Sequence, residues 1–202
     1  MLAGQSGLSH QGRGDKKEAL MSVSGQVTVV FSLARAENGA IGYHGKLPWR
    51  LPNDLKRFKS LSMGKPVVMG RATFDRDLGF KTLPGRLNIV CSRDPAFTAK
   101  GVVIARSIQE ALLIGEADAK AKAVDEIHVI GGAEIFRAAL PYAGRIYLTE
   151  VHASPQADTF LPPFDPRDWR ETFREPHQAD VQSTLPYTFI TLERIHPPAP
   201  ID

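Results

Sequence analysis

Apolar runs rich in β-branched residues recur along the chain and predict a series of buried strands. The runs lie at 26–34, 66–70, 87–92, 102–105, 126–130, 145–151 and 187–193. Helices are predicted from Pro52, over 71–77, from Ser107 and after Gly132. Because strands alternate with helices, the pattern indicates an α/β chain with a mainly parallel sheet covered on both faces. The last strands have no helix between them and indicate an antiparallel edge.

The helix that begins at Pro52 carries the most specific local signals. Proline suits the first helical position, where its missing N–H would have no intrahelical partner. Asp54 then falls in the first turn, where the helix dipole favours a negative charge. Phe58 follows one turn later on the same face. The basic residues of this helix are expected to point towards water: Lys56, Arg57 and Lys59.

Two further segments have clear local chemistry. The stretch 35–49 contains three glycines and is predicted to be a loop that can move and approach a ligand closely. Ser107 and Glu110 have the spacing of a capping box, which opens a helix.

The two ends differ from the rest of the chain. Residues 1–22 are rich in Gly, Ser and Gln, without periodicity, and are predicted to form a disordered arm because they cannot bury enough apolar surface. Met21 offers an alternative start. Residues 23–196 are predicted to form one domain, and 197–202 a short loose tail.

Composition is ordinary for a globular protein, with 202 residues, 43% hydrophobic and 23% charged, and a net charge of +3. No apolar run is long enough to span a bilayer, and no Lys/Arg run marks nucleic-acid binding, so neither partner is expected. The single cysteine, Cys91, excludes an intramolecular disulfide and a Cys-rich metal pattern. No metal site is expected, and a reducing cytoplasm is the simplest setting.

Asp54 is surrounded in sequence by large apolar residues, Trp49, Leu55 and Phe58. A carboxylate among such groups is costly unless a ligand pairs with it, and a flat, nitrogen-rich ring would do so. Two strand-to-helix junctions, 69–73 and 130–135, could hold phosphate through backbone N–H groups. The dinucleotide fingerprint with three spaced glycines is absent, so an ordinary Rossmann fold is not supported.

The motif LPWRLPNDLKRFK at 47–59 closely resembles that of dihydrofolate reductases. Further matching motifs follow in order: GAIG at 39–42, KPVVMGRATF at 65–74, LPGR at 83–86, VIGG at 129–132, EIF at 134–136 and IYLT at 146–149. The similarity runs from Val27 to Ile195, and the chain is identified as a member of the bacterial-type family. The resemblance implies a single-domain fold with a central, mostly parallel sheet, an antiparallel C-terminal strand and flanking helices.

The resemblance implies NADPH-dependent reduction of 7,8-dihydrofolate to tetrahydrofolate, which feeds one-carbon metabolism. Hydride goes to C6 and a proton to N5. The implied catalytic residues are Asp54, Trp49 and Thr149, with Asp54 too far from N5 for direct transfer and acting electrostatically and through an ordered water. The implied substrate-binding residues are Ser32, Leu33, Asp54, Leu55, Phe58, Lys59, Leu78, Lys81, Arg86, Ile130 and Thr149. Arg86 matches the arginine that binds the glutamate tail.

The family pattern also implies a cofactor site. Its residues are Ala34, Ala40, Ile41, Gly42, Gly45, Lys46, Leu47, Gly70, Arg71, Ala72, Thr73, Cys91, Ser92, Arg93, Arg106, Ile130, Gly131, Gly132, Ala133, Glu134, Ile135, Phe136 and Ala138. Among them, Arg71, Arg93 and Arg106 are placed around the ribose 2′-phosphate, which favours NADPH over NADH. Antifolates such as methotrexate or trimethoprim are implied ligands, and a monomer is expected.

Some positions depart from the family pattern. Lys81 stands where many bacterial members have arginine, the segment 75–82 is longer, Ser32 replaces a larger apolar residue, and Phe136 replaces a tyrosine. The alternative functions are a pyrimidinone reductase of riboflavin synthesis and a catalytically silent folate- or nucleotide-binding protein. The first would not need the 49–59 motif, and retention of Asp54 argues against the second.

Overall fold

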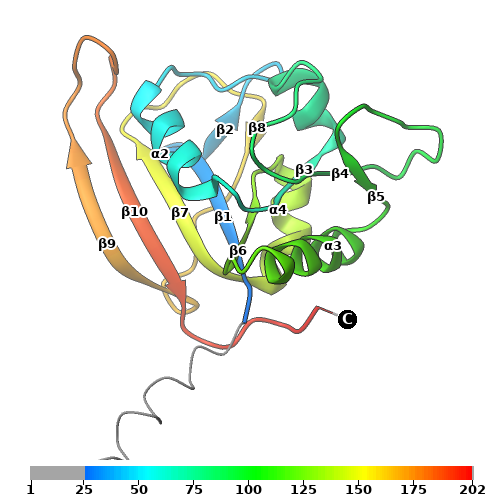
Figure 1. The fold of residues 1–202 in the computed structure, drawn as a ribbon. Helices are drawn as coiled ribbons and strands as arrows, with labels where there is room; N and C mark the ends of the chain where they lie inside the picture. Colours follow the sequence, from blue (N-terminus) through cyan, green and yellow to red (C-terminus); the bar gives the residue numbers. More distant parts are fainter. Residues whose placement is uncertain (1–25, 202) are drawn as a thin grey trace, which may run out of the picture.

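An eight-stranded sheet organises residues 26–201, which this computed structural model describes (Figure 1). The strands are β1 Thr28–Ala36, β3 Val67–Gly70, β4 Asn88–Cys91, β5 Val103–Ala105, β6 Glu126–Val129, β7 Ala143–Val151, β9 Trp169–His177 and β10 Tyr187–Arg194. Their order is β5-β4-β3-β6-β1-β7-β10-β9. Pairing is parallel from β5 to β7 and antiparallel for β10 with both of its neighbours. The predicted fold class is confirmed.

Part of the predicted 35–49 loop is strand. β2 (Ala40–Gly42) pairs with β8 (Thr159–Phe160) in a small antiparallel sheet, and Tyr43 and Lys46 form a bridge just beyond it. A single-sequence pattern could not predict this pairing, because the partner strand lies far along the chain. The loop is therefore tied down at its first half.

Helices begin where their capping residues indicated. α2 spans Pro52–Ser62 with proline in its first turn, and α3 spans Ile108–Ala121. Ser107 Oγ accepts a hydrogen bond from the Glu110 N–H at 3.0 Å, as a capping box requires. α4 (Ala133–Ala139) continues into the 3₁₀ turn η2 (Leu140–Tyr142). The helix expected over 71–77 is mostly a π-helical turn, η1 (Thr73–Asp77).

Alternate side chains of β1 divide the core between the two faces of the sheet. Val29 and Phe31 pack in a cluster that includes Leu112 of α3 and residues of α4, so these helices cover one face. Ala34 packs with Leu51, at the start of α2, in a cluster on the other face. Figure 1 shows α2 lying in front of β1 and β7. The face beneath α2 is the one that carries the site.

β9 was not predicted from the sequence. Its burial pattern shows one buried residue, Trp169, followed by exposed positions, and it pairs only with β10 at the edge of the sheet. The register shifts between Thr191 and Leu192, which places an irregularity in this pairing. The missing apolar alternation reflects an edge strand whose side chains mostly face water.

The C-terminal segment differs from the expected loose tail. The Ala199 N–H donates to the Pro141 carbonyl at 2.9 Å, and Ile201 packs, partly buried, against the main core cluster. Residues 197–201 are thus held at two points. The predicted arm, 1–22, lies outside the described residues, and the division of the chain at residues 22 and 196 stays a prediction.

Candidate active site

Asp54 lies in the first turn of α2, where that helix meets the end of β7. The hydroxyl of Thr149, which is 1% exposed, donates to Asp54 Oδ1 at 2.5 Å. The two residues are 95 positions apart in sequence, and the fold brings them into contact as the sequence analysis expected. The hydrogen bond fixes the carboxyl while leaving its second oxygen for a ligand.

The pKa of Asp54 is raised above its ordinary value. Burial is the largest cause, because it disfavours the charged form. The hydrogen bond from Thr149 and the positive charge of Arg57 oppose the shift without cancelling it. The sequence left this balance between burial and stabilising partners open. In the structure the effect of desolvation on the Asp54 pKa exceeds the opposing effects of Thr149 and Arg57, so the carboxyl holds a proton more readily than an exposed aspartate does.

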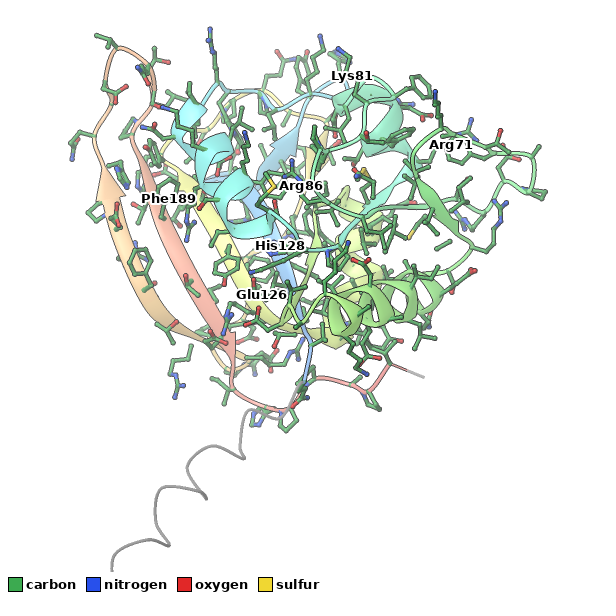
Figure 2. All side chains as sticks on the ribbon, in the orientation of Figure 1. Arg71, Lys81, Arg86, Glu126, His128 and Phe189 are labelled. Carbon is green, nitrogen blue, oxygen red and sulfur yellow. The ribbon has the colours of Figure 1, made fainter. Side chains whose placement is uncertain are left out.

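Arg57 does not point into water, contrary to the prediction. Its guanidinium lies 4.4 Å from the ring centre of Phe189 and 5.7 Å from that of Tyr147, and Nη1 donates to the Leu148 carbonyl at 3.4 Å. Lys56 and Lys59 are exposed, as expected. The flat guanidinium stacks on aromatic rings of the neighbouring strands, which a lysine could not do as well. Phe189 is labelled beside α2 in Figure 2.

A cavity of about 210 Å³ surrounds Asp54. The predicted substrate residues that line it are Ser32, Leu33, Asp54, Leu55, Phe58, Leu78, Ile130 and Thr149. Its wall is mostly apolar with a few polar side chains, as is usual for a site that binds a small organic molecule. Leu55, at 57% exposure, lies at the mouth of this cavity.

Three predicted substrate residues, Lys59, Lys81 and Arg86, do not line this cavity. Figure 2 shows Lys81 at the periphery, and both lysines are exposed. Arg86 Nη1 donates to Ser62 Oγ at 2.9 Å, and its guanidinium lies 5.6 Å from the ring centre of Phe58, which does line the cavity. Arg86 is therefore separated from the smaller cavity only by the side chain of Phe58.

Trp49 packs against the cluster beneath the start of α2 and lines neither cavity of the site. Its indole Nε1 is buried, and within residues 26–201 no group accepts a hydrogen bond from it. A buried donor of this kind is costly unless a bound molecule satisfies it. The side chain thus retains a polar atom for a ligand or an ordered water.

A second cavity, of about 1110 Å³, adjoins the first. The two share wall residues: Ile41, Leu47, Thr73, Asp77 and Gly132. The predicted cofactor residues that line the larger cavity are Ile41, Gly42, Gly45, Lys46, Leu47, Gly70, Arg71, Ala72, Thr73, Cys91, Ser92, Arg93, Arg106, Gly132, Ala133, Glu134, Ile135 and Ala138. A molecule in one cavity can therefore touch a molecule in the other.

The remaining predicted cofactor residues lie elsewhere. Ala34, Ile130 and Phe136 line the smaller cavity instead, whereas Ala40 and Gly131 line neither. Ala40 is fully buried, because β2 presents its side chain to the core.

Glycines let β3 and α4 approach each other closely beside the larger cavity, which Gly70 lines. A Cβ on Gly70 would lie 2.9 Å from Ile135 Cγ1, and a Cβ on Gly131 would lie 3.0 Å from Phe136 Cε2. Gly131 also has a φ of 108°, and its peptide bond to Gly132 is cis. Larger residues at these positions would push α4 away from β3, so the glycines permit the close approach of strand and helix.

The three arginines predicted to hold a phosphate all line the larger cavity, but two are already engaged. Arg71 pairs with Asp94 at 2.8 Å and with Asp75 at 3.2 Å, and these hydrogen bonds raise its pKa. Arg106 donates to the carbonyls of Ser92 and Pro95, at 3.1 and 3.3 Å. Arg106 thus holds the loop that contains Ser92 and Pro95. A phosphate that binds Arg71 would replace Asp94 as the partner of this guanidinium.

Several lining residues were not predicted. Tyr147 and Arg57 face the smaller cavity, as do Leu61 and Asp77. Those that face the larger cavity are His44, Arg76, Asp94, Ser107, Ile108, Asp158 and Thr159. Tyr147 could have been found, because it lies two residues before Thr149 on the same face of β7. Asp158 and Thr159 approach only through the pairing of β8 with β2, for which the sequence has no signal.

Residues 26–201 contain neither a cluster of metal-ligating side chains nor a helix that could span a membrane. Among residues 26–201, no group of three or more His, Cys, Asp or Glu side chains is placed to hold a metal ion. Over the same range, no helix has the length and apolar character needed to cross a membrane.

Comparison with known proteins gives one consistent family. The family model described as dihydrofolate reductase matches residues 28–194. Dihydrofolate reductase type 3 of Salmonella typhimurium is 42% identical over 161 residues, 80% of this chain and 94% of that protein. The dihydrofolate reductase of Haemophilus influenzae is 38% identical over 168 residues, 82% and 99% of the two chains. A solved dihydrofolate reductase from Enterococcus faecalis, complexed with NADP(H) and RAB-propyl, has a TM-score of 0.72 and 34% identity, covering 85% of this chain and 98% of that one.

A mainly parallel sheet that carries a small cavity with Asp54 in its wall, next to a larger cavity lined by glycines and arginines, fits an oxidoreductase that uses a nicotinamide dinucleotide. The chain belongs to the dihydrofolate reductase family. Its reaction is the NADPH-dependent reduction of dihydrofolate, and the family, activity and cofactor predicted from the sequence are confirmed.

Proposed function

We propose that this chain reduces 7,8-dihydrofolate to tetrahydrofolate with Asp54 as the anchor of the pterin ring. The observation that carries this assignment is the hydrogen bond between half-buried Asp54 and buried Thr149, in a cavity that shares its wall with a second, larger cavity. One oxygen of Asp54 faces Thr149, and the other accepts from the pterin 2-amino group and the adjacent ring nitrogen. Leu55 and Phe58 pack on the ring and the linker.

The larger cavity fits NADPH. Its glycines leave backbone open to the ligand, and its cationic side chains, Arg71, Arg93, Arg106 and Lys46, suit the phosphates. When bound, NADPH supplies the hydride for C6. The shared residues Ile41, Leu47, Thr73 and Gly132 hold the two rings in contact, so the chain contributes orientation to the transfer.

Asp54 promotes protonation at N5 without touching that atom. Its ionised form stabilises positive charge on the neighbouring ring, and an ordered water carries the proton to N5. The raised pKa lets the carboxyl exchange a proton with that water more readily than an ordinary aspartate. The buried indole N–H of Trp49 has no acceptor among residues 26–201 and lies near the start of α2, where it donates to this water.

Arg86 is the proposed partner of the substrate's glutamate tail. It lies beside Phe58, which lines the smaller cavity, and donates to Ser62. Burial lowers the pKa of Arg86, and a carboxylate partner would offset the cost of that partly desolvated charge. Lys59 and Lys81, which lie outside the cavity, add only long-range attraction for the anionic tail.

The segment 43–49 excludes water from the junction of the two cavities. Leu47 lines both, while the tie between β2 and β8 restricts movement to the residues after Gly42. Closure of this short segment would cover the nicotinamide, and its opening would release product. We further propose a monomeric enzyme in the cytoplasm that binds antifolates such as methotrexate or trimethoprim in the smaller cavity.

The test is loss of NADPH absorbance on addition of dihydrofolate to the purified full chain. Turnover that methotrexate abolishes supports the proposal. NADPH and dihydrofolate binding without turnover would instead indicate a silent binding protein. Turnover only with a pyrimidinone substrate would indicate the other reductase of this fold.

A further inference from the structure

A row of polar side chains crosses the sheet face beneath α2, apart from the groups assigned to the reaction. The register of β1 with β6 places Val30 opposite His128, and that of β1 with β7 places Ser32 opposite Tyr147. Because side chains alternate between the faces of a strand, Ser32, His128 and Tyr147 share the face that carries Thr149. Ser32 and Tyr147 also line the smaller cavity.

Glu126 is the centre of this row and is 2% exposed. Its Oε1 accepts from Arg145 Nη1 at 2.6 Å and from the Tyr147 hydroxyl at 2.7 Å, and its Oε2 accepts from Lys65 Nζ at 2.6 Å. Burial alone would raise the pKa of Glu126. The contact with His128 and the hydrogen bonds from Lys65 and Tyr147 outweigh burial and hold the pKa of Glu126 far below the usual range. The carboxylate is therefore ionised and can only accept hydrogen bonds.

His128 lies between Glu126 and Ser32 and has no exposed surface. Figure 2 shows Glu126 and His128 next to each other below α2. His128 Nε2 is 3.2 Å from Glu126 Oε2, and Nδ1 is 2.9 Å from Ser32 Oγ. The Nε2 contact is poorly aligned for a hydrogen bond, yet a neighbouring carboxylate still favours the tautomer with the proton on Nε2. Burial lowers the pKa of His128, so the ring is neutral and Nδ1 is an acceptor.

This tautomer fixes the role of the Ser32 hydroxyl. Its only proton is donated to Nδ1, so its oxygen retains lone pairs and no further donor. We propose that Ser32 is a specificity-determining residue whose hydroxyl oxygen, oriented by His128, accepts a hydrogen bond from a ring N–H of the bound pterin. His128 and Glu126 are positioning residues that act through Ser32.

The proposal deepens the proposed function, on which it rests, by giving the smaller cavity a second acceptor besides Asp54. A ligand ring that presents an N–H to the β1 side gains a partner there. A ring that presents only an acceptor faces the lone pairs of Ser32 Oγ and is repelled, because the Ser32 hydroxyl proton is already donated to His128. An apolar residue at position 32 would discriminate between such rings only by shape.

The first experiment compares Ser32→Ala, Ser32→Thr and the matched control Ser60→Ala, an exposed serine on α2. Ser32→Ala should raise KM for dihydrofolate by roughly 2- to 12-fold, the range for one neutral hydrogen bond, and leave KM for NADPH unchanged. Ser32→Thr keeps the hydroxyl and should restore KM. An unchanged dihydrofolate KM in Ser32→Ala overturns the proposal, whereas absence of turnover in the unaltered chain would overturn the proposed function instead.

The second experiment tests the positioning role of His128 in the unaltered chain, so it does not require a folded variant. Nitrogen-15 NMR of the histidine-labelled chain should show His128 neutral, with its proton on Nε2, and ligand binding should perturb the Nδ1 signal. Proton placement on Nδ1 overturns the proposal. As a further check, His128→Leu should raise the dihydrofolate KM in the native chain but add nothing in Ser32→Ala, because both changes remove the same contact. Independent, additive effects would also overturn it.

Discussion

The environment of a residue in this site determines its pKa and its orientation. Asp54 carries an ordinary carboxyl group, but burial raises its pKa and Thr149 holds it in one orientation. The first prediction concerns its charge. Asp54→Asn keeps the shape and can still accept from Thr149, yet it loses the negative charge, so turnover of dihydrofolate at neutral pH should fall on the order of 10²–10⁴-fold. Steady-state NADPH oxidation measures this.

A suitable control for that variant is Asp125→Asn, since Asp125 is an exposed acid on the far side of Lys65. Its turnover should match that of the unaltered chain. Near-normal activity of Asp54→Asn would remove Asp54 from the mechanism.

Arg57 provides a second residue-scale prediction. Its charge opposes the upward shift of the Asp54 pKa. Replacing Arg57 with methionine keeps the aliphatic length and removes the charge, so the pKa of Asp54 should rise further. The carboxyl carbon-13 shift of Asp54 followed against pH measures this directly. Lys56→Met, at an exposed neighbouring position, should leave the pKa of Asp54 unchanged. An unchanged Asp54 pKa in Arg57→Met would refute the coupling between Arg57 and Asp54.

The sequence predicted Asp54 and Thr149 well but misjudged Arg57. A carboxylate among apolar neighbours stands out in a sequence because its burial is costly. An arginine next to two other basic residues resembles a solvated helix face, and only the rings of Tyr147 and Phe189, supplied by β7 and β10, draw it inward. Contacts of this kind depend on strand pairing and cannot be read from local pattern.

At the scale of elements, local chemistry decides where helices begin. Ser107 caps α3, and Glu110 Oε2 accepts a hydrogen bond from the Arg106 N–H at 2.6 Å. Ser107→Ala should lower the free energy of unfolding by about 1 kcal/mol, because the Glu110 N–H loses its partner at the first turn. Urea denaturation measures the loss. Ser154→Ala, in an exposed loop, is the control, and equal stability of the two variants would contradict the assigned cap.

Elements differ in how far sequence could predict them. Central strands such as β1 and β6 were predicted because apolar β-branched runs mark strands that are buried on both faces. β9 was missed because its side chains face water, and η1 was expected as an ordinary helix because helical sequence patterns do not distinguish the wider π-turn. The β2–β8 pair was missed because its strands are two or three residues long.

For the whole molecule, the Glu126 network links β6, β7 and β10 through Arg145, which also bonds Glu193 at 2.6 Å. Glu126→Gln should lower the free energy of unfolding at neutral pH by roughly 3 kcal/mol, because positive partners lose their buried counter-charge. The folded-state pKa of Glu126 lies below its unfolded value, so this stability is present above about pH 4.3 and is lost as pH falls. The variant and the unaltered chain should therefore converge on acidification.

Denaturant unfolding at neutral and acidic pH measures that convergence. Glu116→Gln is the matched control, because its partner Lys120 belongs to a surface pair on α3 and should contribute under about 1 kcal/mol at any pH. A difference between Glu126→Gln and the unaltered chain that persists unchanged into acid would contradict the linkage.

The exposed strand β9 has a consequence for crowded solutions. It leaves one side of its backbone unpaired by the rest of the sheet, yet its sequence WRETFREPH sets arginine and glutamate side by side, places a proline near its end, and meets β10 through a shifted register. A second chain that tried to add a strand there would meet charges and an irregular ladder. This edge of the sheet thus disfavours the addition of a strand from a second chain.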